Sequence, residues 1–190
     1  MKRFQITSGA LVCSDPCYTT DIWCMGIVNN VMKGTWIAEV EHGDFGGWGE
    51  RIAELKVCHE SRYPGHGKWE ELPGDFGVDS GQFGFFDNEH YRKADSVKTM
   101  KKYDFGGDYL TDGNDRDGEE WYHACCELTL GPDSWGVLPN GVVSSSGFGD
   151  GSYAVYGLKN DGGEYVAFKV VFIDAAEFED DDDEENEDEF

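Results

Sequence analysis

The chain has 190 residues, with 39 acidic against 15 basic residues and a formal charge of −24 at neutral pH. This length suits a single domain, and so negative a chain repels a phosphate backbone, which argues against direct binding of DNA or RNA. The sequence has no run of about eighteen apolar residues and no signal-peptide core after its first residues, so we expect a cytoplasmic protein that does not enter a membrane.

In chain order, several segments alternate apolar and polar residues with the period of a half-buried strand. This pattern predicts strands over 35–41, 51–59 and 121–130, and the apolar run 83–86 predicts a further short strand. Helical signal is scarce. We expect a surface helix over 90–103, which contains neither Gly nor Pro, and a short helical turn over 21–26.

A β-hairpin is predicted near the end of the folded part. Residues 153–158 and 165–173 flank Asn160-Asp161-Gly162-Gly163, whose residues tolerate positive φ. The second strand is apolar on both faces, which is typical of a central strand. We therefore expect one mainly β domain over residues 1–176, a sandwich or partly closed barrel with one or two short helices.

The last fourteen residues, 177–190, contain eleven acidic and no basic residues. Such a run buries little apolar area and repels itself, so it predicts a disordered tail. Without those eleven acidic residues the formal charge of −24 becomes −13. The tail either keeps the protein soluble, or it mimics nucleic acid and captures a basic partner.

Six cysteines occur in a chain that is large enough to build its own core, so a disulfide framework is not required. The spacings Cys13-x3-Cys17 and His123-x-Cys125-Cys126 contain zinc-ligand types but fit no common zinc pattern. If 121–130 is a strand, Cys125 and Cys126 point to opposite faces. We expect reduced, mostly buried thiols, with structural zinc as the alternative and no assigned metal ligand.

The string Ser14-Asp15-Pro16-Cys17-Tyr18 is the most distinctive short motif. Pro16 fixes its own φ and favours extended geometry at Asp15, so the carboxylate is held in a stiff turn. Asp15 either caps the backbone or serves as a binding or catalytic carboxylate. Cys17 is a candidate nucleophile if a base in space lowers its pKa.

Three Ser-Gly turns, each followed by an acid, occur where a β segment meets a glycine-rich turn. If these turns gather at one end of the fold, their side chains form a candidate ligand site. We expect Asp79, Asp87 and Asp150 to be the carboxylates to test for a hard cation, Ca²⁺ or Mg²⁺, although no cofactor is otherwise indicated. The full candidate set is Asp15, Cys17, Asp79, Ser80, Gln82, Asp87, Ser146 and Asp150.

Two charged segments have simpler interpretations. The basic cluster within 90–103 is either a solvated helix face or a docking site for the tail or for a phosphate. The acid-rich segment 104–120 fails the EF-hand template, because Asp117 stands where that loop needs Gly, and we expect a solvated loop. The common signatures of hydrolases, nucleotide-binding loops and zinc proteases are absent from the sequence.

The strings Ser14-Asp15-Pro16-Cys17-Tyr18, Asp79-Ser80-Gly81-Gln82 and Gly149-Asp150-Gly151-Ser152-Tyr153 together resemble an uncharacterised family of bacterial and phage proteins. The resemblance spans most of residues 4–174. It implies a small cytoplasmic protein that is encoded by a phage or related to one, and it carries over no catalytic residue.

Three hypotheses about function follow. The first is a non-enzymatic acidic protein that binds a basic protein partner, such as a phage accessory factor that binds a nucleic-acid-binding host protein. The second is a metal-assisted hydrolase or small-ligand-binding protein that uses the loop carboxylates. The third is glycan binding by exposed Trp and Tyr, although we expect most of these rings in the core. The oligomeric state is not predicted.

Overall fold

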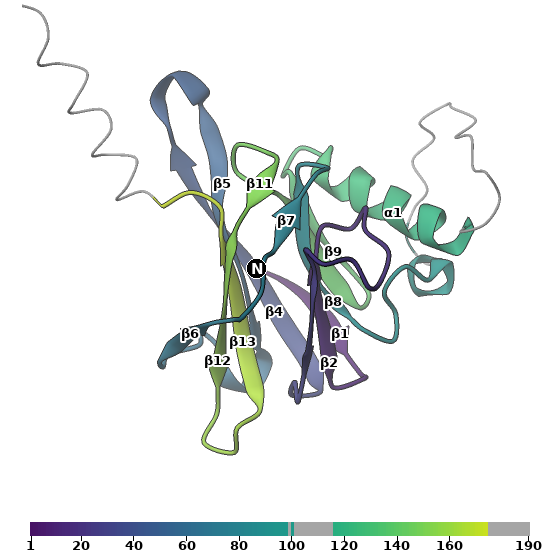
Figure 1. Cartoon of the computed structure of the whole chain (residues 1–190), viewed down its shortest axis with the longest axis vertical. Helices are drawn as coiled ribbons and strands as arrows, with labels where there is room; N and C mark the ends of the chain where they lie inside the picture. Colours follow the sequence, from purple (N-terminus) through teal and green to yellow (C-terminus); the bar gives the residue numbers. More distant parts are fainter. Residues whose placement is uncertain (99, 101–115, 175–190) are drawn as a thin grey trace, which may run out of the picture.

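The computed structural model of the chain describes residues 1–98, 100 and 116–174. Two antiparallel sheets pack face to face, with one α-helix on the outer side of the second sheet (Figure 1). This arrangement confirms the predicted mainly β sandwich. Among the described residues, none of the helices is both long and apolar enough to cross a membrane.

The first sheet has six strands in the order β1-β4-β5-β13-β12-β6. Their bounds are β1 Lys2–Ile6, β4 Gly34–Asp44, β5 Glu50–His59, β6 Trp69–Glu71, β12 Ala154–Lys159 and β13 Tyr165–Val171. The strands predicted over 35–41 and 51–59 and the hairpin around residues 160–163 are confirmed. β13 lies between β5 and β12, as its apolar residues on both faces predicted.

The second sheet has five strands in the order β3-β2-β8-β10-β9. Their bounds are β2 Ala10–Ser14, β3 Gly26–Asn29, β8 Gln82–Asp87, β9 Trp135–Leu138 and β10 Gly141–Ser145. β8 contains the predicted strand 83–86, and every one of its residues is buried. A separate two-stranded ribbon pairs β7 Gly77–Val78 with β11 Gly151–Ser152.

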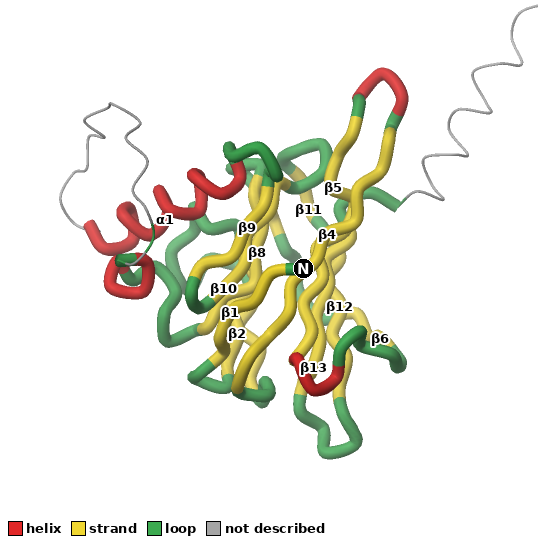
Figure 2. Tube along the Cα trace, turned by 180° about the vertical axis from the view of Figure 1, so that it is seen from behind, coloured by secondary structure: helices red, strands yellow, loops and turns green. Residues whose placement is uncertain are grey.

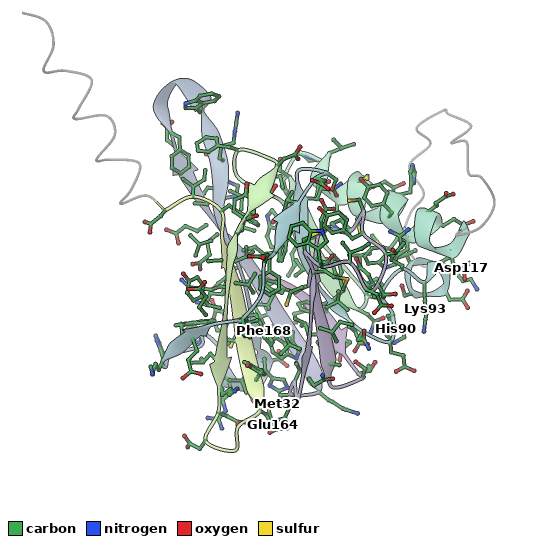
Figure 3. All side chains as sticks on the ribbon, in the orientation of Figure 1. Met32, His90, Lys93, Asp117, Glu164 and Phe168 are labelled. Carbon is green, nitrogen blue, oxygen red and sulfur yellow. The ribbon has the colours of Figure 1, made fainter. Side chains whose placement is uncertain are left out.

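The main core fills the space between the two sheets. Phe168 of β13, labelled in Figure 3, is fully buried and packs its ring against Trp36 of β4, with ring centroids 5.9 Å apart. The same ring lies 6.0 Å from Phe85 of β8, so one side chain bridges both sheets. Burying aromatic rings in this way contributes the largest share of apolar area per residue.

The segment 121–130, predicted as a strand, is instead part of the helix α1 Arg116–Thr129. Its buried apolar side chains are Trp121, Ala124 and Cys125, with Leu128 packed beside them, which is the spacing of one helix face. The alternation that suggested a strand included Leu130, which is 75% exposed. These helix residues pack on the outer face of the second sheet, against Val12, Phe86, Leu138 and Val143 (Figure 1).

The two helices expected at 90–103 and 21–26 are also wrong. Within 90–103 the structure has only the 3-10 helix η3, Ala94–Val97, while residues 99 and 101–103 lie outside the described part. Residues 21–25 form turns and irregular backbone, Gly26 begins β3, and Asp21 has φ +71°, which a helix does not allow. Short 3-10 helices also occur at Gly46–Trp48 (η1) and Glu60–Arg62 (η2).

The predicted tail 177–190 and residues 104–115 lie outside the described residues, and 116–120 begin α1.

Replacing the bridging ring tests the packing of the two sheets. Phe168→Ala removes a fully buried aromatic side chain, so we expect a loss of about 3–5 kcal/mol in the free energy of unfolding, measured with urea. Leu130→Ala, at an exposed position, is the control and should change stability by less than about 0.5 kcal/mol. A loss below about 1 kcal/mol for Phe168→Ala would contradict the bridging role.

Candidate functional site

The carboxylate of Asp15 joins two loops that are far apart in the sequence. Asp15 follows β2 and is fully buried. Its Oδ2 accepts the backbone N–H groups of Asp79 at 2.9 Å and Ser80 at 2.7 Å. Its Oδ1 accepts the Ser80 hydroxyl at 2.6 Å and the backbone N–H of Cys17 at 2.8 Å. Four donors therefore satisfy this carboxylate, as burial of a charge requires. We call this arrangement the Asp15 clamp.

Gln82 extends the Asp15 clamp toward the helix. Its amide nitrogen lies 3.4 Å from the Ser80 hydroxyl and 3.4 Å from the Tyr122 hydroxyl. Its amide oxygen accepts the Thr129 hydroxyl at 2.9 Å. Both Tyr122 and Thr129 belong to α1, and the sequence reasoning missed them because it assigned that segment to a strand.

Hydrogen bonds from Tyr91 and Arg92 to backbone carbonyls also hold the loop 15–18 in place. The Tyr91 hydroxyl donates to the carbonyl of Tyr18 at 2.8 Å, and Tyr91 is buried. The guanidinium of Arg92 donates to the carbonyl of Pro16 at 2.9 Å. One residue of the basic cluster in 90–103 therefore holds the Asp15 loop in place.

The surroundings of Cys17 keep its thiol protonated. Burial raises its pKa to about 12, and the negative charges of Asp15 and Asp79 act in the same direction. Burial also raises the pKa of the Tyr18 and Tyr122 hydroxyls. Because the thiolate is the nucleophilic form of cysteine, this environment does not activate Cys17 at neutral pH.

Asp87 forms a separate clamp at the other end of the second sheet. Its Oδ2 accepts the backbone N–H groups of Thr7 and of Ser8, the latter at 2.9 Å, and its Oδ1 accepts that of Glu89 at 2.9 Å. Ligand-type atoms of Asp87, Glu89 and His90 lie within 4.8 Å of one another, and this is the one such group among the described residues. Since three backbone donors already satisfy the Asp87 carboxylate, its placement is explained without a cation.

An open cavity of about 430 Å³ lies beside this group. Two of its lining residues, His90 and Lys93, are labelled in Figure 3. The lining contains acidic, basic and neutral side chains, namely Glu89, His90, Lys93, Asp95, Ser96, Pro139 and Asn140.

Ser146 and Asp150 lie in the loop between β10 and β11, which meets the Asp15 clamp only through its backbone, where the Ser146 N–H donates to the carbonyl of Gly81 at 3.1 Å. The Ser146 hydroxyl donates to the carbonyl of Gly149 at 2.9 Å, and the Tyr153 hydroxyl donates to the same carbonyl at 2.7 Å. The Asp150 side chain is exposed. These hydrogen bonds stabilise the turn 146–149. The side chain of Phe148, within this turn, is 48% exposed.

Five of the eight candidate residues thus come together, and three do not. Asp15, Cys17, Asp79, Ser80 and Gln82 meet at the Asp15 clamp, although Asp79 joins it through its backbone and is itself exposed. Asp87, Ser146 and Asp150 lie elsewhere. Both oxygens of the Asp15 carboxylate accept hydrogen bonds from within the chain. The Asp15 clamp therefore joins the loops 15–17 and 79–80.

A cluster of exposed aromatic rings was not anticipated from the sequence. The ring of Phe148 lies 5.6 Å, centroid to centroid, from both Phe45 and Trp48 at the end of the β4–β5 hairpin. Trp48 is 64% exposed, whereas Phe45 is buried. We call Phe45, Trp48 and Phe148 the aromatic tip. The only sequence signal for this cluster was that its three aromatic residues stand among glycines in the turns 45–49 and 147–149.

Replacing the buried carboxylate tests the Asp15 clamp. Asp15→Asn puts an amide where two oxygens accept four donors, so some of these donors lose their partner. We expect a loss of about 2–4 kcal/mol in the free energy of unfolding, measured with urea. Asp161→Asn, at an exposed turn position, is the matched control and should leave stability unchanged. Equal stability of both variants would contradict the clamp.

The raised pKa of Cys17 predicts slow alkylation. At pH 8 iodoacetamide should modify Cys17 more slowly than an unhindered cysteine, whose pKa is about 8.5, and the rate should keep rising up to about pH 11. Peptide mass spectrometry measures the modification at each cysteine, and Cys17→Ser identifies the Cys17 product. Rapid labelling at pH 7 that levels off near pH 8 would contradict the protonated thiol.

Residues 4–170 match a protein family described as a protein of unknown function, DUF4241. The expected membership in an uncharacterised family is thereby confirmed. No curated protein and no solved structure matches the chain.

Proposed function

This chain belongs to the DUF4241 family, and we propose that it is an interaction protein that binds a basic partner protein without catalysing a reaction. The partner chemistry we favour is that of a nucleic-acid-binding protein, because such proteins present clustered Lys and Arg for phosphate contacts. A phage accessory role is one setting in which an acidic protein of this kind acts on a host protein.

One observation carries the proposal: the carboxylates lie on the surface and outnumber the cations there. Of the 24 acidic residues in the described part, 17 are exposed and only Asp15, Asp87 and Glu127 are buried. In the same part, only 7 basic residues are exposed. A surface with this imbalance attracts cationic partners over a distance set by the Debye length, about 10 Å at 0.1 M salt.

Much of the basic charge is already used within the chain. Lys169 bonds to Glu54 at 2.7 Å, and Lys56 lies 3.2 Å from Glu39, both on the outer face of the first sheet. Lys2 bonds to Asp133 at 3.0 Å. Each pair uses one carboxylate for one cation, so the net excess of carboxylates remains, and these three cations do not repel a basic partner as free cations would.

The Asp15 clamp supports a binding role over a catalytic one. A general base or metal ligand needs a carboxylate that can exchange partners, whereas both oxygens of Asp15 are engaged in short hydrogen bonds. A nucleophilic cysteine needs a lowered pKa, whereas that of Cys17 is raised. The proposal therefore includes no cofactor.

A titration with a cationic probe tests this function. We expect the full chain to bind a fluorescent Arg-Gly peptide of about twelve residues, with an affinity that falls at least about tenfold between about 20 and 300 mM NaCl, as measured by fluorescence anisotropy. A Glu-Gly peptide of equal length is the control and should not bind. EDTA should leave the affinity for the Arg-Gly peptide unchanged.

Changing the tail separates its contribution from that of the body. A chain with all eleven acidic residues of 177–190 changed to their amides keeps the length of the tail and removes its charge. We expect weaker binding than for the native chain, but still salt-dependent binding by the body. Absence of binding by the native chain, or binding that salt does not weaken, would contradict the proposed function.

A further inference from the structure

The β4–β5 hairpin projects beyond the rest of the first sheet, and its tip carries the 3-10 turn Gly46–Trp48 (Figure 2). Strand pairing extends out to Asp44 and Glu50, so the projecting part is a paired ladder up to the turn. The backbone of the turn is closed by the N–H of Trp48 donating to the carbonyl of Phe45 at 3.1 Å. The aromatic tip therefore stands on an ordered support.

Phe148 reaches the aromatic tip from a different part of the chain. Its ring meets those of Phe45 and Trp48 edge to face, with interplanar angles of 69° and 61°. Phe45 is 4% exposed and anchors the group, while Trp48 and Phe148 remain open to solvent. Two exposed rings contributed by separate segments form a continuous aromatic surface.

The space around these rings is open. A Cβ atom added at Gly46, Gly47 or Gly149 would have no heavy atom within 4 Å. These three glycines lie in the two loops that carry Trp48 and Phe148, so the described residues leave open space at these positions. A partner chain can approach the rings closely at these positions.

Exposed carboxylates belong to the same two loops as the aromatic tip, and that of Asp44 accepts the backbone N–H of Gly46 at 3.2 Å. Asp44 and Glu50 face each other at the last register position of the hairpin, and Asp150 stands two residues after Phe148. All three are exposed. Asp174, also exposed, follows Ile173, whose backbone N–H donates to the carbonyl of Ala53 in β5.

Arg51 and His42 also lie near this end of the hairpin. The guanidinium of Arg51 donates to the carbonyl of Glu50 at 2.9 Å, and His42 lies 3.3 Å from the Glu50 carboxylate. Four carboxylates against one permanent cation leave the surroundings of the aromatic tip negative.

Other exposed apolar residues lack this combination. Trp23 is 79% exposed and stacks on no other ring among the described residues, and Leu130, which is 75% exposed, is not aromatic. Single exposed apolar side chains are common on monomeric proteins, whereas clustered aromatic residues are typical of the centre of a binding surface.

We propose that the aromatic tip, together with Asp44, Glu50 and Asp150, docks an arginine-rich segment of a partner protein. This inference rests on the proposed function and names its contact surface. The planar guanidinium of arginine stacks on aromatic faces and binds carboxylates through two parallel hydrogen bonds, whereas the compact ammonium of lysine does neither as well. A surface that offers exposed rings beside carboxylates therefore selects arginine over lysine.

Two peptides of equal length and charge, Arg-Gly and Lys-Gly, test the proposal on the full chain. The native protein should bind the Arg-Gly peptide more tightly than the Lys-Gly peptide at about 150 mM NaCl. Trp48→Ala should weaken binding of the Arg-Gly peptide by about tenfold and binding of the Lys-Gly peptide by less than about threefold. Phe148→Ala should have the same direction of effect.

Trp23→Ala is the matched control, since it removes another exposed tryptophan, and it should leave both affinities unchanged. Urea unfolding of each variant establishes that it is folded. If the native chain binds neither peptide, the proposed function itself fails. If it binds both with the expected salt dependence and Trp48→Ala changes nothing, only the docking surface is overturned.

Sedimentation of the native chain and of Trp48→Ala distinguishes one further occupant, a second copy of this chain. We expect the same sedimentation coefficient for both proteins. A native dimer that becomes a monomer on Trp48→Ala, without a change in peptide affinity, would assign the aromatic tip to self-association and overturn the proposal.

Discussion

The fully buried carboxylate of Asp15 is the constraint on which the functional end of the molecule depends. It accepts hydrogen bonds from the two loops 15–17 and 79–80, so one carboxyl group joins the end of β2 to the start of β8. A buried carboxylate is stable only when hydrogen-bond donors surround it. Any change that opens either loop removes some of these donors and therefore costs free energy of folding. Asp15 and Ser80, which the sequence suggested as ligand-binding residues, instead hydrogen-bond to each other and stabilise the fold.

The Asp15 clamp is connected to the aromatic tip through the backbone. Gly81 follows the clamped Ser80, and its carbonyl accepts the N–H of Ser146 at 3.1 Å. Ser146 begins the loop that carries Phe148, and Tyr153 closes that loop from its other end. The position of Phe148 beside Trp48 therefore depends on the loop that Asp15 holds. One path of contacts therefore connects the buried carboxylate of Asp15 with the exposed rings of Phe148 and Trp48.

The strands were predictable because burial of one face leaves a simple alternation in the sequence. Residues 34–44 and 50–59, and the hairpin around Asn160, followed this rule. The helix α1 was missed because Tyr122, Ala124 and Cys126 also satisfy the period of a strand, and the decisive contacts of Trp121 and Cys125 are tertiary.

At the candidate site, the stiffness of Asp15 was predictable from Pro16, but the convergence with Ser80 depends on the pairing of β2 with β8. The exposure of Trp48 could not be predicted, since composition alone places most tryptophans in a core.

The central claim is that an arginine-rich partner is bound at the aromatic tip of an acidic protein. The most direct measurement is the shift of the six tryptophan indole N–H signals in nuclear magnetic resonance spectra while the Arg-Gly peptide is added. The account predicts that the Trp48 signal moves first and furthest, while those of the buried Trp36 and Trp121 and of the exposed Trp23 stay in place. An unchanged Trp48 signal at saturating peptide, with shifts elsewhere on the surface, would contradict it.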